Sequence, residues 1–83
     1  MLKVKAIFEE NRDVFEYLQK RWLVEQYRKA KAKIIAGNTK ELSLRQPKKE
    51  WVWYFRVNDQ FRAFAKLEWD TLIVFDIYNH QHG

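Results

Sequence analysis

Three successive segments in the C-terminal part of the chain alternate apolar and polar side chains, and two short polar turns separate them. The segments are WVWYFRV, FRAFAKLE and TLIVFDIY, and all three are rich in β-branched and aromatic residues. A period of two is typical of strands with one buried face, and turns this short join neighbouring antiparallel strands. The sequence therefore predicts a three-stranded antiparallel meander over residues 51–78.

The numbering of the apolar residues predicts which face of this meander is buried. If a loop with an odd number of residues connects two antiparallel strands, the odd-numbered side chains of both strands lie on the same face of the sheet. A loop with an even number of residues would place them on opposite faces. Residues 58–60, Asn-Asp-Gln, form a loop of the first kind, because Asn and Asp tolerate the left-handed backbone that we expect there. Residues 69–71 are expected to form the second loop. The predicted core face consists of the odd-numbered apolar residues Trp51, Trp53, Phe55, Val57, Phe61, Ala63, Ala65, Leu67, Ile73, Phe75 and Ile77.

This register places two arginines opposite each other on the face away from the core. Arg56 pairs with Arg62, Tyr54 pairs with Phe64, and Arg62 also pairs with Tyr78. Like charges directly opposite each other destabilise a sheet. We therefore expect an anion between the two guanidiniums, which can hold a phosphate bidentately. The alternative is that the arginines only keep an exposed hairpin soluble.

Residues 9–36 lack Gly and Pro and have the composition of a helix. Val14 and Trp22 belong to an apolar stripe with helical spacing, and Asn11 or Asp13 can cap the first turn. One helix of this length would measure about 40 Å, which is long for so small a domain. The segment therefore predicts two helices that pack as a hairpin.

The sequence also predicts where the two helices are separated, where the second one ends, and what flanks them. We expect the break between the two helices near residues 20–24, and Gly37 is a suitable residue to end the second helix. Residues 2–8, LKVKAIF, have the alternation of a half-buried strand. Residues 38–50 are polar and are expected to form a loop, with or without a short strand at residues 41–44.

Length and composition limit the class of protein. A chain of 83 residues is long enough for one domain with a single core, here residues 1–83. The expected fold is α+β: an N-terminal strand, the helical hairpin, and the meander, which forms one sheet with the first strand. The absence of cysteine excludes disulfides and thiolate chemistry. No apolar stretch has the length of a membrane span or secretion signal, and we expect a soluble cytoplasmic protein. The lack of a Gly-rich phosphate loop excludes an NTPase.

Positive charge is concentrated in the middle of the chain. Residues 20–49 carry ten of the 16 Lys and Arg residues but only two carboxylates, Glu25 and Glu41. Clustered charge of one sign raises the local potential and favours a polyanion or an acidic protein as the partner. The alternative is a solvated, lysine-rich helix face without a partner.

A few side chains around the arginine pair could take part in catalysis or binding. His80 and His82 are the groups whose ordinary pKa lies near neutrality, so they are candidates for the general acid or base. Two histidines without a carboxylate cluster are a weak metal signal, and we expect neither a metal nor a cofactor. Aromatic side chains can stack unpaired bases and cations can bind the flanking backbone, although such aromatics often only cover a neighbouring element. The candidate contacts to a nucleic acid are Tyr54, Phe64, Lys66, Arg45, Lys48 and Lys49.

The order of strand, two helices, basic loop and meander, together with WYFRVNDQFRAFAKLEWDTLIVFDIYNHQ, resembles the RelE/ParE superfamily of bacterial toxins from toxin–antitoxin pairs. RVNDQFR is most similar to the hairpin of the HigB branch. The resemblance implies a small basic endoribonuclease that cleaves messenger RNA on the ribosome without a metal. In this reaction the 2′-hydroxyl of the RNA attacks the adjacent phosphate, and the protein supplies a base, an acid and cations.

The resemblance also assigns roles to individual residues. Arg62 matches the phosphate-binding arginine after the hairpin, and Arg56 matches the basic residue before it. His80 matches the histidine that ends the HigB branch in the sequence Asp-Tyr-His. This chain has Tyr78-Asn79-His80 instead, so Tyr78 is a candidate to replace the tyrosine from the adjacent position. Two further assignments are looser: Lys48 and Lys49 for the loop lysines, and His82 as an additional acid or base.

Three hypotheses about function follow. The first is a toxin that acts as a ribosome-associated mRNA endonuclease, and its partner would be an antitoxin with an acidic, partly disordered tail. The second is a toxin of the ParE branch, which inhibits DNA gyrase and cleaves no RNA. The third is a non-catalytic RNA-binding or protein-binding module. His80 and the arginine pair favour the first hypothesis, because gyrase inhibition needs no acid or base.

Overall fold

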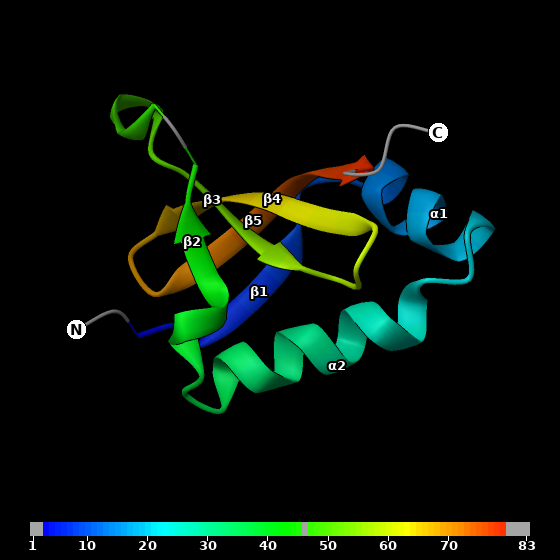
Figure 1. The fold of residues 1–83 in the computed structure, drawn as a ribbon, viewed down its shortest axis with the longest axis horizontal. Helices are drawn as coiled ribbons and strands as arrows, with labels where there is room; N and C mark the ends of the chain where they lie inside the picture. The colour runs from blue at the N-terminus through cyan, green and yellow to red at the C-terminus, as the bar shows by residue number, and fades with distance from the viewer. Residues whose placement is uncertain (1–2, 46, 80–83) are drawn as a thin grey trace.

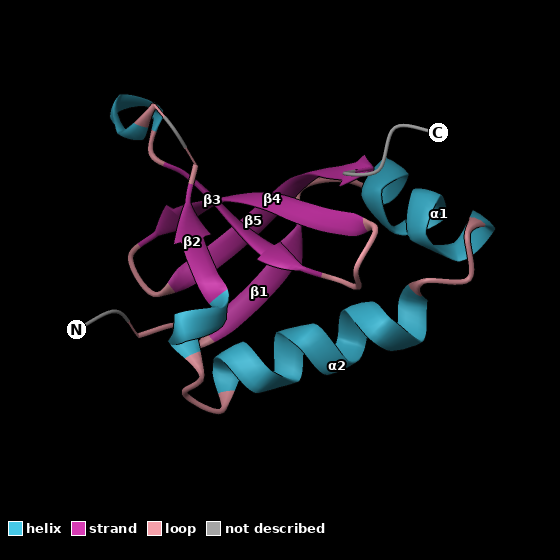
Figure 2. Cartoon of the chain, viewed as in Figure 1, coloured by secondary structure: helices cyan, strands magenta, loops and turns pink. Residues whose placement is uncertain are grey.

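A computed structural model describes residues 3–45 and 47–79 of the chain, and it shows an α+β fold with two α-helices and a five-stranded mixed sheet (Figures 1 and 2). The elements in chain order are β1 (Ala6–Glu9), α1 (Arg12–Lys20), α2 (Val24–Ile35), the 3₁₀ turn η1 (Thr39–Glu41), β2 (Leu42–Leu44), the 3₁₀ turn η2 (Lys48–Glu50), β3 (Val52–Arg56), β4 (Phe61–Glu68) and β5 (Thr71–Asn79). In these residues no helix is long and apolar enough to span a bilayer.

The sheet contains one strand more than the four-stranded arrangement that the sequence predicts. Its order is β1-β5-β4-β3-β2, with β1 parallel to β5 and the other neighbours antiparallel. The additional strand is the short β2, where Leu42 pairs with Phe55 and Leu44 pairs with Trp53. Leu42 is buried there, which stabilises the short strand that the sequence left as one of two possibilities at residues 41–44.

The two helices begin and end close to their predicted positions. Asn11 caps α1, and its Oδ1 accepts a hydrogen bond of 3.4 Å from the backbone N–H of Val14. The break falls between α1 and α2 as predicted, and Gly37 follows α2 with a φ of +113°. The predicted hairpin is wrong, because α1 lies beside the end of β5 while α2 extends away from it (Figure 1).

Trp22 does not belong to the apolar stripe of the helices. It lies in the link between α1 and α2 with a φ of 59°, and it is 90% exposed. The buried position in this link belongs to Leu23, which is 4% exposed. The prediction that Trp22 belongs to the apolar stripe is therefore wrong, because Trp22 lies in the break itself.

Both α-helices pack on one face of the sheet, which we call the helix-covered face. Apolar residues from α1, α2 and all five strands form one cluster there, and the most deeply buried large side chains include Leu18, Tyr27, Phe55 and Ile34. Neither α1 nor α2 covers the opposite face, which we call the helix-free face. Tyr54, Arg56, Arg62, Phe64, Lys66 and Tyr78 alternate with core residues along their strands and so lie on the helix-free face.

The predicted core face is correct for β4 but wrong for half of β5. The turn between β4 and β5 has two residues rather than three, because Glu68 pairs with Thr71. Further along, Phe64 pairs with Asp76 and Ala65 pairs with Val74, so the pairing skips Phe75 in a β-bulge. Two other residues of β5 therefore take the predicted places of Ile73 and Phe75 in the core: Leu72 and Val74, both 0% exposed. Trp51 is also wrongly predicted, since it precedes β3 and is 65% exposed.

Candidate functional site

A side chain rather than a left-handed backbone builds the tight turn between β3 and β4. Asn58 Oδ1 accepts hydrogen bonds of 2.8 Å from the backbone N–H groups of Gln60 and Phe61. The N–H of Val57 donates to the carbonyl oxygen of Phe61 at 2.9 Å and closes the loop. None of the residues 58–60 has a positive φ, so the expected left-handed backbone is not needed.

The hairpin holds the two arginines opposite each other, as the sequence predicts. Arg56 pairs with Arg62 across β3 and β4, and Arg62 pairs with Tyr78 across β4 and β5. Directly opposite residues on one face have Cβ atoms about 4.5–5.5 Å apart. The two guanidiniums and the Tyr78 phenol therefore extend from one row on the helix-free face.

Both arginines line the same open depression, which has a volume of about 280 Å³. Tyr54 from β3, Ser43 from β2, and Lys40 and Glu41 from η1 complete its lining. The pairing of β2 with β3 brings these residues together. Ser43 lies directly opposite Tyr54, so the turn η1 that precedes β2 lies beside the arginines. Three cations and one carboxylate thus meet at a concave surface.

The charges of this depression are only partly neutralised by the protein. Arg56 forms an ion pair of 3.6 Å with Asp59, but both side chains are largely exposed. Such a pair contributes little because water and salt screen it. The depression therefore carries more positive than negative charge, and Glu41 is the carboxylate in its lining.

An aromatic row crosses the helix-free face beside the arginines. The rings of Tyr54 and Phe64 meet edge to face at 6.1 Å, and those of Phe64 and Tyr78 stack at 5.5 Å. The guanidinium of Arg45 lies 5.1 Å from the centroid of the Phe64 ring. Phe64 is therefore largely occupied by protein neighbours, whereas Tyr54 lines the depression and is the better placed ring for stacking a base.

Three other predicted cations, Arg45, Lys49 and Lys66, are not among the residues that line this depression. Lys48 and Lys49 lie in η2, at the end of β3 opposite to Arg56. Arg45 pairs with Glu50 at 2.7 Å, and Lys66 lies one row beyond Phe64 opposite Val52. Five of the predicted site residues therefore lie together: Arg56, Arg62, Tyr78, Tyr54 and Phe64. The two predicted histidines, His80 and His82, are outside the described residues.

The sequence interpretation missed Lys40, Glu41 and Ser43 as residues of this site. A short strand at residues 41–44 was one possibility, but its partner strand could not be derived from so few residues. The pairing of Ser43 with Tyr54 is the information that places all three at the arginines.

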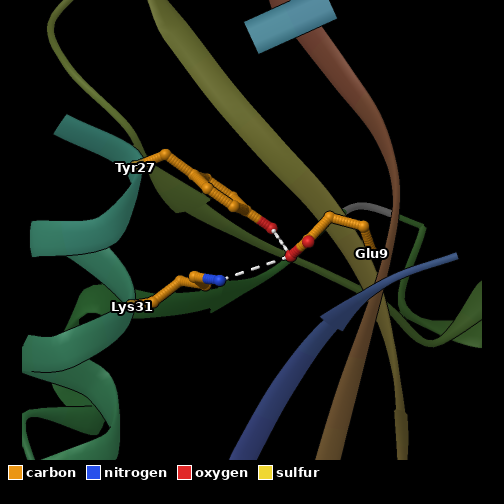
Figure 3. Close-up of polar contacts among 3 residues, drawn as sticks. All are labelled: Glu9, Tyr27 and Lys31. Atoms are coloured by element: carbon orange, nitrogen blue, oxygen red, sulfur yellow. Dashed lines mark hydrogen bonds and ion pairs between the residues drawn. The ribbon is translucent and has the colours of Figure 1, made fainter. Parts of the chain in front are cut away.

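A polar cluster on the helix-covered face fixes α2 against the sheet (Figure 3). The phenol of Tyr27 donates a hydrogen bond of 2.8 Å to Glu9 Oε2, and Lys31 Nζ donates to the same oxygen at 3.3 Å. Burial and the neighbouring Glu9 carboxylate raise the pKa of the Tyr27 phenol far above its ordinary value of 10.0. The Tyr27 ring also stacks on Phe55 at 6.2 Å, so the cluster positions α2 relative to β3 and Arg56.

Within residues 3–45 and 47–79, no three His, Asp or Glu side chains are grouped so that they could hold a metal ion. Comparisons with models of known protein families and with curated proteins found no match to this sequence.

Proposed function

We propose that the chain is the toxin of a toxin–antitoxin pair, of the RelE/ParE type, and that it cleaves messenger RNA on the ribosome without a metal. The observation that supports this proposal most is the depression that Arg56 and Arg62 share with Glu41 and Tyr54. It combines cations for a phosphate, a carboxylate for a proton and a ring for a base.

The chemistry of RNA cleavage assigns a role to each group. The 2′-hydroxyl of a nucleotide attacks the adjacent phosphorus, and the bond from phosphorus to the 5′-oxygen breaks. The products end in a 2′,3′-cyclic phosphate and a 5′-hydroxyl. Glu41 accepts the proton of the 2′-hydroxyl, and the two guanidiniums stabilise the negative charge that develops on the phosphate oxygens.

The departing 5′-oxygen needs a proton donor. Tyr78 lies on the same row as Arg62 and supplies a phenol on the correct face. His80 is the other candidate, on the basis of its place in the sequence. Substituting each residue separately distinguishes the two, because only loss of the true donor lowers cleavage while RNA binding remains.

Controlled expression in a bacterial host tests the proposal. We expect wild-type expression to arrest growth and to produce cleaved mRNA on ribosomes, with gyrase supercoiling unaffected. Arg62→Ala should abolish both effects. The matched control is Arg28→Ala, which removes an exposed arginine of α2 that does not line the arginine depression.

Each outcome of this experiment has a defined meaning. Harmless expression of the wild type in a host without an antitoxin would contradict the proposed function. Inhibited supercoiling with intact mRNA would favour gyrase inhibition. Cleavage that survives Arg62→Ala would retain the activity but contradict the site.

A further inference from the structure

A second depression adjoins the first on the side of α2. It has a volume of about 360 Å³ and shares two of its residues, Arg56 and Glu41, with the arginine depression. The remaining lining residues are Gln26, Lys29, Ala30, Lys33, Ile34, Phe55 and Val57. The two depressions are therefore neighbours, with Arg56 and Glu41 between them.

Two lysines on one side of α2 give this second depression its charge. Lys29 and Lys33 are four residues apart in the helix, so their side chains extend from the same face of α2 one turn apart. Both are exposed, and no ion pair with a carboxylate is found for either of them among residues 3–45 and 47–79. Their charges are thus available to a ligand.

Three apolar residues of the second depression contribute little exposed surface. Ile34 and Phe55 are each 1% exposed and Val57 is 7% exposed, because they belong to the core. Lys29, Lys33 and Arg56 bring three positive charges to the lining, against the one carboxylate of Glu41. This excess of cations suits a ligand whose charges lie along its backbone, such as a single-stranded nucleic acid.

The position of α2 relative to the arginines is fixed at two points. Asn58 Nδ2 in the hairpin turn donates a hydrogen bond of 2.8 Å to Gln26 Oε1 at the beginning of α2. Tyr27, the next residue of the helix, stacks on Phe55, the residue before Arg56. Lys29 and Lys33 are therefore held at a defined place beside the arginine depression.

We propose that the second depression is a phosphate subsite for the same RNA strand, which passes from the helix-free face over Arg56 to Lys29 and Lys33. This inference rests on the proposed function, because it extends the strand that Arg56 and Arg62 hold. Glu41 also lines both depressions, so it lies between the two phosphates, within the part of the site where the 2′-hydroxyl is expected. Each phosphate then lies on one side of Glu41, and Arg56 contacts both.

Binding of an uncleavable RNA tests the subsite. The probes are 2′-O-methyl oligonucleotides of two lengths, a trinucleotide that reaches one subsite and an octanucleotide that reaches both. In the variant Lys29→Gln/Lys33→Gln, we expect octanucleotide affinity to fall by about tenfold and trinucleotide affinity to remain unchanged. The slope of log affinity against log salt should become shallower by about 0.7 for each lost phosphate contact.

Two variants control for charge and for folding. Lys20→Gln/Arg28→Gln removes the same charge from two exposed residues outside both depressions, and we expect less than a threefold loss. Lys29→Arg/Lys33→Arg keeps the charge and should restore octanucleotide binding.

The outcomes separate this inference from the proposed function. If the wild type cleaves RNA but Lys29→Gln/Lys33→Gln matches the control in affinity and salt slope, the subsite is wrong and the function stands. If the wild type binds neither oligonucleotide, both are wrong. If the double variant loses affinity for a poly-glutamate peptide but keeps its affinity for RNA, the second depression binds an acidic protein and the inference is overturned.

Discussion

The two faces of the sheet differ in whether their charged side chains are paired with opposite charges. On the helix-covered face, Glu9 accepts hydrogen bonds from Tyr27 and Lys31, so the half-buried carboxylate has both a donor and a counter-charge. On the helix-free face, Arg56 and Arg62 lie opposite each other, and the ion pair of Arg56 with Asp59 is largely exposed. The first arrangement stabilises the fold, and the second costs stability unless an anion is present.

This difference supports the helix-free face as the site of the proposed function. If every charged side chain of the sheet were paired with an opposite charge, the fold would be more stable, but no position would attract an anion. The repulsion between the two arginines lowers the stability of the fold only slightly, because their side chains reach solvent. An anion bound in the depression would relieve this repulsion, which favours its binding. Substitutions on the two faces should therefore affect different properties of the protein.

The largest effect on stability is expected for a core aromatic residue of the helix-covered face. Phe55→Ala should lower the free energy of unfolding by about 3–5 kcal/mol, because Phe55 is 1% exposed. Phe8→Ala is the matched control on the helix-free face, where Phe8 is 58% exposed, and it should cost less than about 1 kcal/mol. Urea unfolding measures both, and equal losses would contradict the assignment of the two faces.

The next effect concerns the polar cluster. Tyr27→Phe removes the hydrogen bond to Glu9 and should lower the free energy of unfolding by about 1.5–3 kcal/mol. An unchanged urea midpoint in this variant would show that the hydrogen bond contributes nothing to stability.

Tyr27 should also make the stability of the protein depend on pH. The folded-state pKa of Tyr27 is raised, so its stabilising contribution is fully present below the ordinary pKa of 10.0 and is lost as pH rises above it. There the unfolded phenol ionises while the folded phenol stays protonated. Wild-type stability should fall above pH 10 by up to about 1.4 kcal/mol per pH unit more than that of Tyr27→Phe. Parallel curves from urea unfolding at each pH would contradict this prediction.

A turn substitution should have a smaller effect of opposite sign. Trp69 is the first residue of the two-residue turn between β4 and β5, with a φ of 60° and 95% exposure. Glycine is preferred at such a position because it has no Cβ to strain. Trp69→Gly should raise the free energy of unfolding by about 1 kcal/mol. A loss of stability would show that the tryptophan ring makes a contact that its exposure does not suggest.

The smallest effect on stability is expected at the arginine pair itself. Arg62→Gln removes the repulsion and should change the free energy of unfolding by less than about 0.5 kcal/mol, toward greater stability. The same substitution should weaken binding of a 2′-O-methyl trinucleotide by about tenfold or more. A variant that is both destabilised and unchanged in binding would reverse the roles that we assign to the two faces.

The sequence predicts the arginine row correctly, although two of the assumptions behind it are wrong. The turn after β4 is one residue shorter than expected, and the bulge at Phe75 adds that residue back before Tyr78. Arg62 therefore still pairs with Tyr78, whereas the part of β5 before the bulge has its faces exchanged. Periodicity cannot show such a bulge, because the apolar run from Leu72 to Phe75 fits either face.

Other parts of the site depend on tertiary contacts that a single sequence does not reveal. The helix boundaries follow from local features such as the Asn11 cap and Gly37, and they are predicted well. Glu41 enters the site only because the short β2 pairs with β3, which depends on the burial of Leu42. Lys29 and Lys33 could be recognised as helical cations, but their place beside Arg56 depends on how α2 packs.

Chemical-shift mapping of the ¹⁵N-labelled protein with an uncleavable 2′-O-methyl RNA tests the central claim most directly. We expect the largest shifts, at low salt, for Tyr54, Arg56, Arg62 and Glu41, together with the Nε signals of the two arginines. Arg62→Gln should abolish them. Shifts confined to the helix-covered side of the molecule, or shifts that persist unchanged in Arg62→Gln, would contradict an anion site between the facing arginines.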